Sequence, residues 1–141
     1  MTKRSDNPTA DDANPTPFDD LGVAVSRGEP LSHHTWLGIG GEAAWFCEPI
    51  NIDTLGRVVK RCQEQLIPVR VIGGGSNVLV PTAGYAGMVM RLNAPVFCEI
   101  TVERPLIRAG AGAKLVHVVS AAVQAGLAGL EMLVDVPGTV G

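Results

Sequence analysis

Hydrophobic residues in this chain occur in short runs and in helical stripes, and the change from one pattern to the other predicts its elements. Residues 43–47, 69–72 and 88–92 are short runs rich in apolar or β-branched side chains. Such runs are typical of buried strands. Residues 98–102 instead alternate apolar and polar, and residues 106–109 follow after a proline turn, so this stretch predicts a half-buried hairpin.

Two longer segments carry apolar side chains at helical spacing. In residues 51–66 the predicted inner face is Ile52, Leu55, Val58, Val59, Cys62 and Leu66. Asn51 or Asp53 can accept the free N–H groups at the start of this helix, and Pro68 marks its end. A second helix is predicted over 114–125, with an inner face of Leu115, Val118, Val119, Ala122 and Val123. Gly126 suits the left-handed residue that closes a helix.

The order of these elements predicts two subdomains with a boundary near residues 93–97. Strand, helix and strand over 43–72 form a βαβ unit with a parallel sheet. We therefore expect a first subdomain over 18–93, in which Phe18 and Leu21 begin the folded part as a short helix. The hairpin and the second helix begin another subdomain over 94–141. Residues 1–17 are polar and rich in proline, which predicts a disordered tail.

Composition and charge reduce the number of possible functions. The net charge of -3 and the 4% aromatic content disfavour binding of nucleic acid. No window approaches the ~20 apolar residues that a membrane span needs, and no signal-peptide core is evident, so a cytoplasmic protein is expected. Cys47, Cys62 and Cys98 have no zinc-site spacing and are expected to be reduced. His33 and His34 would face opposite sides of a strand, so no metal site is expected.

The glycine-rich loop that follows the predicted strand 69–72 is the strongest chemical signal. Gly73, Gly74 and Gly75 leave no side chains in the way, and successive backbone N–H groups in such a turn can bind an anion such as a diphosphate. Ser76 and Asn77 add side-chain donors. The loop lacks both the spacing of a Rossmann dinucleotide site and the Gly-Lys-Ser/Thr ending of a P-loop, and an apolar run follows it instead of a helix.

Several motifs together resemble the UDP-N-acetylenolpyruvoylglucosamine reductases, also called UDP-N-acetylmuramate dehydrogenases. The resemblance covers about residues 31–141. It rests on His34-Thr35-Trp36 with Ile39-Gly40-Gly41-Glu42-Ala43, on residues 73–80, on Gly110-Ala111-Gly112, on Gly129-Leu130-Glu131 and on Pro137-Gly138-Thr139-Val140-Gly141. It implies an α+β fold, the two-subdomain FAD-binding domain of the vanillyl-alcohol-oxidase (PCMH) type, with the second subdomain incomplete in these residues.

The resemblance also implies the cofactor and its site. FAD would lie with its diphosphate along residues 73–79 and its flavin near residues 137–141, with NADPH as hydride donor and a UDP-sugar as substrate. The residues expected to bind the cofactor are Ile72, Gly73, Gly74, Gly75, Ser76, Asn77, Val78, Leu79, Gly110, Gly112, Pro137, Gly138, Thr139 and Gly141. Asp135 stands beside the expected flavin turn, where the family usually has an uncharged residue.

No catalytic residue is expected within this chain. In the family, a serine proton donor, an arginine and a glutamate act on the substrate, and the resemblance implies that they lie outside these 141 residues. His117 is expected on the solvent side of its helix. Two alternatives stay open: a flavoprotein oxidase of the vanillyl-alcohol type, which the absence of histidine from the glycine loop disfavours, and a non-catalytic flavin-binding module or remnant.

Overall fold

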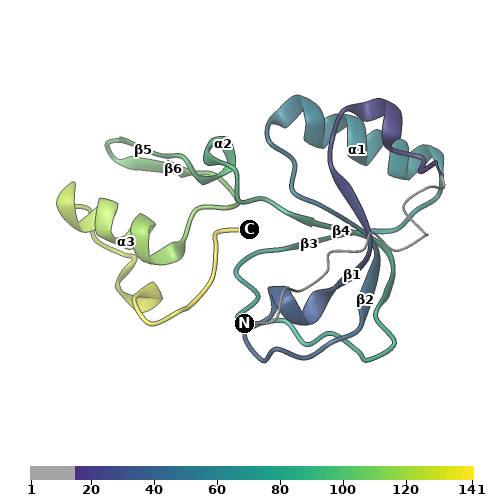
Figure 1. The fold of residues 1–141 in the computed structure, drawn as a ribbon. Coiled ribbons are helices and arrows are strands. Elements are labelled where there is room, and N and C mark those ends of the chain that lie inside the picture. Colours follow the sequence, from purple (N-terminus) through teal and green to yellow (C-terminus); the bar gives the residue numbers. More distant parts are fainter. Residues whose placement is uncertain (1–14) are drawn as a thin grey trace, which may run out of the picture.

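The computed structural model describes residues 15–141, which form two lobes joined by the residues between β4 and α2 (Figure 1). The first lobe contains η1 (Asp19–Leu21), β1 (Val25–Pro30), η2 (Leu31–His34), β2 (Glu42–Cys47), α1 (Ile52–Glu64), β3 (Val69–Ile72) and β4 (Tyr85–Arg91). The second contains α2 (Pro95–Cys98), β5 (Ile100–Glu103), β6 (Leu106–Ala109), α3 (Leu115–Gln124) and η3 (Glu131–Leu133). The last residues run back toward the loop that follows β3.

The first lobe is built on a four-stranded sheet in the order β1-β2-β4-β3. β4 pairs in parallel with both β2 and β3, and β1 pairs with β2 in the antiparallel sense. The predicted strands and crossover helix are therefore present, but β4 lies between the two strands that α1 connects. β1 was not predicted. Its sequence has one large apolar side chain, Val25, and contains Gly28 and Pro30, so it lacks the pattern of a buried strand.

Apolar side chains cover both faces of this sheet. On one face, Val58 and Cys62 of α1 pack with Met88 and Met90 of β4. On the other face, Val89 belongs to a second cluster with Leu31, Ala43, Phe46 and Ile72. Successive residues of β4 are thus buried on opposite faces, and this explains why its sequence is a continuous apolar run rather than an alternation.

Helix α1 begins and ends as its sequence dictates. The Asn51 side chain accepts a hydrogen bond from the Thr54 N–H at 2.8 Å, which confirms the predicted cap. After Glu64 the chain turns through Leu66, whose φ is +54°, and this left-handed residue closes the helix before Pro68. Two predicted inner residues are exposed: Ile52 to 67% and Leu66 to 90%. The prediction was wrong for them because Ile52 opens the first turn and Leu66 falls after the last.

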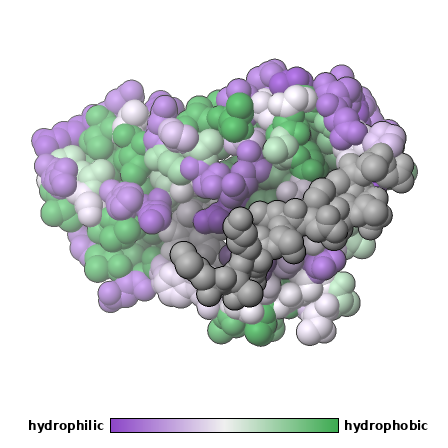
Figure 2. All heavy atoms as spheres, in the orientation of Figure 1, coloured by the Kyte–Doolittle hydropathy of each residue, from purple (hydrophilic) through white to green (hydrophobic). Residues whose placement is uncertain are grey.

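The second lobe combines the antiparallel β5–β6 pair with α3. Val118, Val119 and Ala122 of α3 are buried as predicted, whereas Val123 is exposed. Gly126 closes the helix with a φ of +66°, also as predicted. The hairpin differs from its prediction, because residues 95–98 form the short helix α2 and Val102 remains exposed. Hydrophobic residues accordingly gather on the surface of this lobe in Figure 2.

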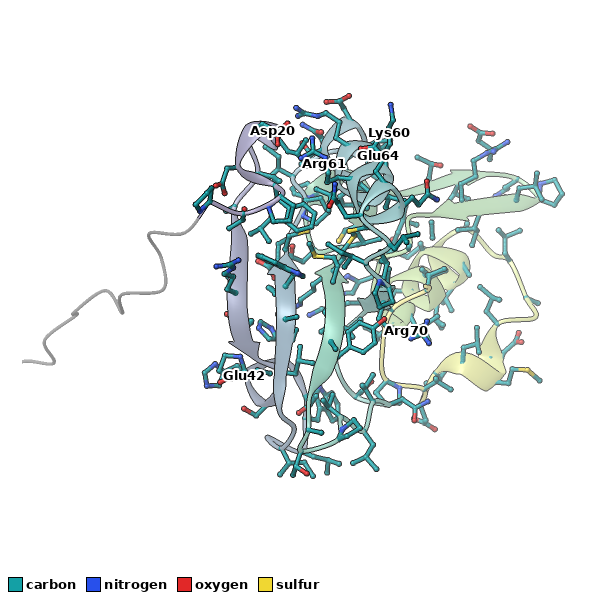
Figure 3. All side chains as sticks on the ribbon, turned by 90° about the vertical axis from the view of Figure 1, so that its right-hand side faces the viewer. Asp20, Glu42, Lys60, Arg61, Glu64 and Arg70 are labelled. Carbon is teal, nitrogen blue, oxygen red and sulfur yellow. The ribbon has the colours of Figure 1, made fainter. Side chains whose placement is uncertain are left out.

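The segment before β1 is fastened to α1. Arg61 donates hydrogen bonds to the Pro17 carbonyl and, at 2.8 and 2.7 Å, to the two carboxylate oxygens of Asp20 (Figure 3). These bonds hold the pKa of Asp20 below its usual value. Of the tail expected to be disordered, residues 1–14 lie outside the described residues, and Thr16 contacts Asp19 through hydrogen bonds. No helix in residues 15–141 is long and apolar enough to cross a membrane.

Candidate functional site

The glycine loop directly follows β3, at the carboxyl end of a parallel strand. Its backbone is held tightly from behind. Gly75 has a φ of +70°, and a Cβ at this position would lie 1.9 Å from the His34 carbonyl oxygen. The Trp36 N–H also donates to the Gly75 carbonyl at 3.0 Å. Only glycine fits this position, and the close approach fixes the loop against residues 34–36.

Gly74 differs from its two neighbours. A Cβ at Gly74 would meet no atom within 4 Å, whereas one at Gly73 would lie 2.3 Å from Thr139 Oγ1. Three adjoining cavities of about 250, 350 and 320 Å³ share Gly74 and Thr139 in their linings. Gly75 is therefore required by packing against the backbone, and Gly73 faces the Thr139 side chain. Gly74 opens onto space that a ligand can occupy.

The N–H groups of the loop are free of hydrogen bonds to the described part of the protein. Within residues 15–141, no backbone or side-chain acceptor takes a hydrogen bond from the N–H of any residue from 74 to 78. Consecutive unpaired N–H groups of a turn form a concave site for an anion. The loop thus offers backbone donors that the protein itself does not use.

The C-terminal turn, residues 137–141, forms the opposite wall. Ser76 Oγ donates to the Pro137 carbonyl at 3.2 Å, which joins the loop to the turn. On its other side the turn is attached to the start of α3. The Leu115 N–H donates to the Gly138 carbonyl at 3.1 Å, and the Val140 N–H donates to the Ala113 carbonyl at 2.9 Å. The glycine loop and the C-terminal turn therefore lie face to face. In the sequence, only the family resemblance connects these two segments.

Two cationic side chains line the same cavities from opposite lobes. Arg91 ends β4, and Lys114 precedes α3. Arg91 approaches Glu48 only loosely, at 3.8 Å, and no carboxylate in residues 15–141 lies within 4.0 Å of the Lys114 ammonium. Sequence analysis missed both residues. For Arg91 a signal existed, since it lies in the predicted strand 88–92, which follows the glycine loop in the sequence, and ligands commonly bind at the ends of strands.

Most of the expected cofactor-binding residues come together. One cavity is lined by Ile72, Gly73, Gly74, Gly75, Ser76, Asn77, Val78, Pro137, Gly138, Thr139 and Gly141. Gly112 lines the adjoining cavity with Lys114. Leu79 and Gly110 line none of these cavities. Leu79 is 74% exposed, and a Cβ at Gly110 would lie 2.1 Å from the Phe97 carbonyl oxygen, so this glycine has a packing role.

The other polar residues that the sequence analysis considered lie at separate places in the structure. Asp135 is exposed, and His117 is exposed at the rim of one cavity. His33 and His34 lie in η2 rather than on the strand that the sequence analysis assumed. The His34 ring stacks on Phe46 at 4.3 Å and is hydrogen-bonded to Glu29 at 2.9 Å. In the part of the chain from residue 15 onward, no three His, Cys, Asp or Glu side chains gather as metal ligands would.

The chain is similar to known proteins over most of its length. Residues 43–141 match the model of a family described as FAD binding domain. Among curated relatives, the UDP-N-acetylenolpyruvoylglucosamine reductase of Rhodopirellula baltica is 43% identical, over 87% of this chain and 40% of the relative. That of Paramagnetospirillum magneticum is 46% identical, over 83% and 38%. The chain thus spans about two fifths of these relatives, which confirm the resemblance seen in its motifs.

Solved structures confirm the fold class. The reductase from Thermus caldophilus superposes with a TM-score of 0.61 at 34% identity, covering 84% of this chain and 40% of that one. Cholesterol oxidase from Brevibacterium sterolicum superposes with a TM-score of 0.60 at 19% identity, covering 79% of this chain and 22% of that one. The second likeness concerns the fold alone.

Proposed function

Because this chain belongs to the family of FAD-binding domains, we propose that the cavities around Gly74 bind FAD, with its diphosphate on the glycine loop. The observation that carries the proposal is the run of unpaired N–H groups over residues 74–78, beside a glycine whose missing side chain opens the cavity. A diphosphate carries negative charge and many acceptor oxygens. Hydrogen bonds from N–H groups to such a charged group contribute about 1.5–3 kcal/mol each.

The charges and the size of the site support the same ligand. Arg91 and Lys114 bring positive charge from both lobes of a chain whose net charge is -3. The adjoining cavities reach the sizes of small-molecule sites, about 300–1,000 Å³. The residues proposed to hold FAD are Ile72, Gly73, Gly74, Gly75, Ser76, Asn77, Val78, Gly112, Pro137, Gly138, Thr139 and Gly141, with Arg91 and Lys114.

We further propose that the chain is the flavin-binding part of a UDP-N-acetylenolpyruvoylglucosamine reductase, which forms UDP-N-acetylmuramate for peptidoglycan synthesis. The name of the relatives supports this function. When bound, FAD supplies hydride transfer from NADPH to the enolpyruvyl group. This chain's own residues bind and orient the cofactor, and none of them is proposed to donate a proton to the substrate. Its three free cysteines fit the reducing cytoplasm.

Purification of the 141-residue chain tests the proposal directly. We expect a yellow protein, or one that becomes yellow with added FAD and keeps it through ultrafiltration, with a flavin absorbance band. Denaturation should release the flavin, because the loop has no histidine for a covalent bond. A protein that retains no FAD would refute the binding site, and flavin that stays attached after denaturation would favour an oxidase of the vanillyl-alcohol type.

A second assay addresses the enzyme. With NADPH and the enolpyruvyl substrate, we expect no turnover by these 141 residues alone, because none of them is proposed to protonate the substrate. The same chain should support turnover when it is part of a polypeptide of the relatives' full length. NADPH-dependent reduction of the substrate by the 141-residue chain would contradict this division of roles.

A further inference from the structure

Trp36 is the most conspicuous side chain at this site that the proposed function does not explain. It is 71% exposed, although tryptophan is among the side chains that gain most from burial. It also lines one of the cavities, together with Gly74, Arg91 and Lys114. Among the residues that line these three cavities it is the only phenylalanine, tyrosine or tryptophan. A large flat apolar surface therefore borders a site rich in donors and positive charge.

The backbone around Trp36 is held in place. Its N–H is bonded to the Gly75 carbonyl at 3.0 Å, so the residue is attached directly to the glycine loop. The turn after it is closed by two bonds. The Gly38 N–H donates to the Thr35 carbonyl at 3.2 Å, and Thr35 Oγ1 donates to the Ile39 carbonyl at 3.1 Å. Trp36 is thus anchored beside the anion site before any ligand arrives, which reduces the entropy lost on binding.

Trp45 provides a contrast within the same chain. Its ring packs edge-on against Phe18 at 5.4 Å, and the Arg27 guanidinium lies over it at 4.7 Å. The Trp45 ring is therefore in contact with other side chains of the protein. Trp36 has no aromatic or cationic partner of this kind in residues 15–141. The surface of Trp36 remains free for a ring that the protein does not supply.

We propose that the Trp36 indole stacks on a flat heteroaromatic ring of the bound dinucleotide. This inference rests on the proposed FAD site. A dinucleotide carries a ring on each side of its diphosphate, so a diphosphate on the glycine loop brings a ring toward the residue that is bonded to that loop. The flavin and the adenine share the chemistry that an indole recognises, namely a planar π surface. Removal of such a stacking partner weakens binding roughly 5- to 150-fold.

The test compares W36A and W36F with L37A, a change at the neighbouring side chain, which is 65% exposed and lines none of these cavities. Dissociation constants for FAD, FMN and ADP would be measured by fluorescence titration or equilibrium dialysis. Melting curves would establish that each variant is folded. We expect W36A to raise the dissociation constant for FAD roughly 5- to 150-fold, W36F to restore most of the affinity, and L37A to match the wild type.

The shorter ligands identify the ring. A loss confined to FMN assigns the flavin, and a loss confined to ADP assigns the adenine; either result supports stacking. If folded W36A binds FAD, FMN and ADP as the wild type does, the inference is overturned while the FAD site stands. If the wild-type protein binds no FAD, the result refutes the proposed FAD site itself.

Discussion

Replacement of Gly74 by leucine separates ligand binding from folding. Gly74 has an ordinary φ, and a Cβ on it would meet no protein atom within 4 Å, so the new side chain has room in the free protein. It would extend into the cavities that Gly74 lines. We therefore expect G74L to fold normally and to bind FAD poorly. G75L should instead damage the fold, because Gly75 has a φ of +70° and touches the His34 carbonyl.

The expected loss of FAD affinity in G74L follows from the hydrogen bonds between the loop N–H groups and the diphosphate. If the leucine side chain keeps the diphosphate from one N–H donor, the loss is about 1.5–3 kcal/mol, which corresponds to roughly 10- to 150-fold in the dissociation constant. Displacement from two donors would reach or exceed the upper figure. The free energy of unfolding should change by less than about 0.5 kcal/mol, as for other substitutions at open surface positions.

The assay is an FAD titration of folded G74L, with a melting curve for each protein. G56L is the matched control, because Gly56 also has no atom within 4 Å of its Cβ position and lies on the exposed side of α1. G56L should keep the wild-type affinity and melt slightly higher, since glycine disfavours a helix by up to about 1 kcal/mol. Wild-type affinity in folded G74L would refute the assignment of the diphosphate to this loop.

Three further predictions concern charge and thiols. R91Q and K114Q should each raise the dissociation constant for FAD about fivefold, from the loss of ~1 kcal/mol of charge attraction at the dielectric constant of water. The affinity of both variants should also depend less on salt, and titrations at two ionic strengths check both effects. Iodoacetamide at pH 8 should alkylate only Cys98 in the folded chain, because burial protects the other two cysteines and raises the pKa of Cys47 to about 12. Bound FAD should slow this alkylation, because Cys98 lines one of the cavities of the proposed site; mass spectrometry would measure both effects. Asp20 has a pKa below its usual 3.8 because of Arg61, so it stabilises the fold above that pH and loses this contribution as the pH falls through the lower folded value. D20N should flatten the pH dependence of the melting temperature in that range, and an unchanged acid slope would contradict the assignment.

Local patterns predicted the elements of this chain well but not their neighbours in space. The runs at β3 and β4 and the stripe of α1 are visible because burial imposes a period on nearby residues. The insertion of β4 between β2 and β3 depends on pairings between distant residues, which no local period records. β1 escaped detection because an edge strand with glycine and proline carries almost no apolar signal.

The candidate site was also predicted only where its residues are neighbours in the sequence. The glycine loop was evident because a strand end without side chains is unusual, and the motifs correctly indicated the family. Arg91, Lys114 and Trp36 were not chosen, because they lie far apart in the sequence and only folding brings them to one cavity. Gly110 was chosen for the cofactor, yet its close contact with Phe97 gives it a packing role. Sequence alone does not distinguish these two uses of glycine.

The placement of the hydrophobic clusters has a consequence for biosynthesis. All buried members of both clusters of the first lobe, from Phe18 to Met90, precede the link to the second lobe. A nascent polypeptide that has emerged from the ribosome as far as β4 therefore already contains every strand of the four-stranded sheet and the helix that covers it. This lobe can therefore fold during translation. The cavity between the glycine loop and the C-terminal turn then forms only after residues 137–141 have been synthesised and pack against the folded lobe.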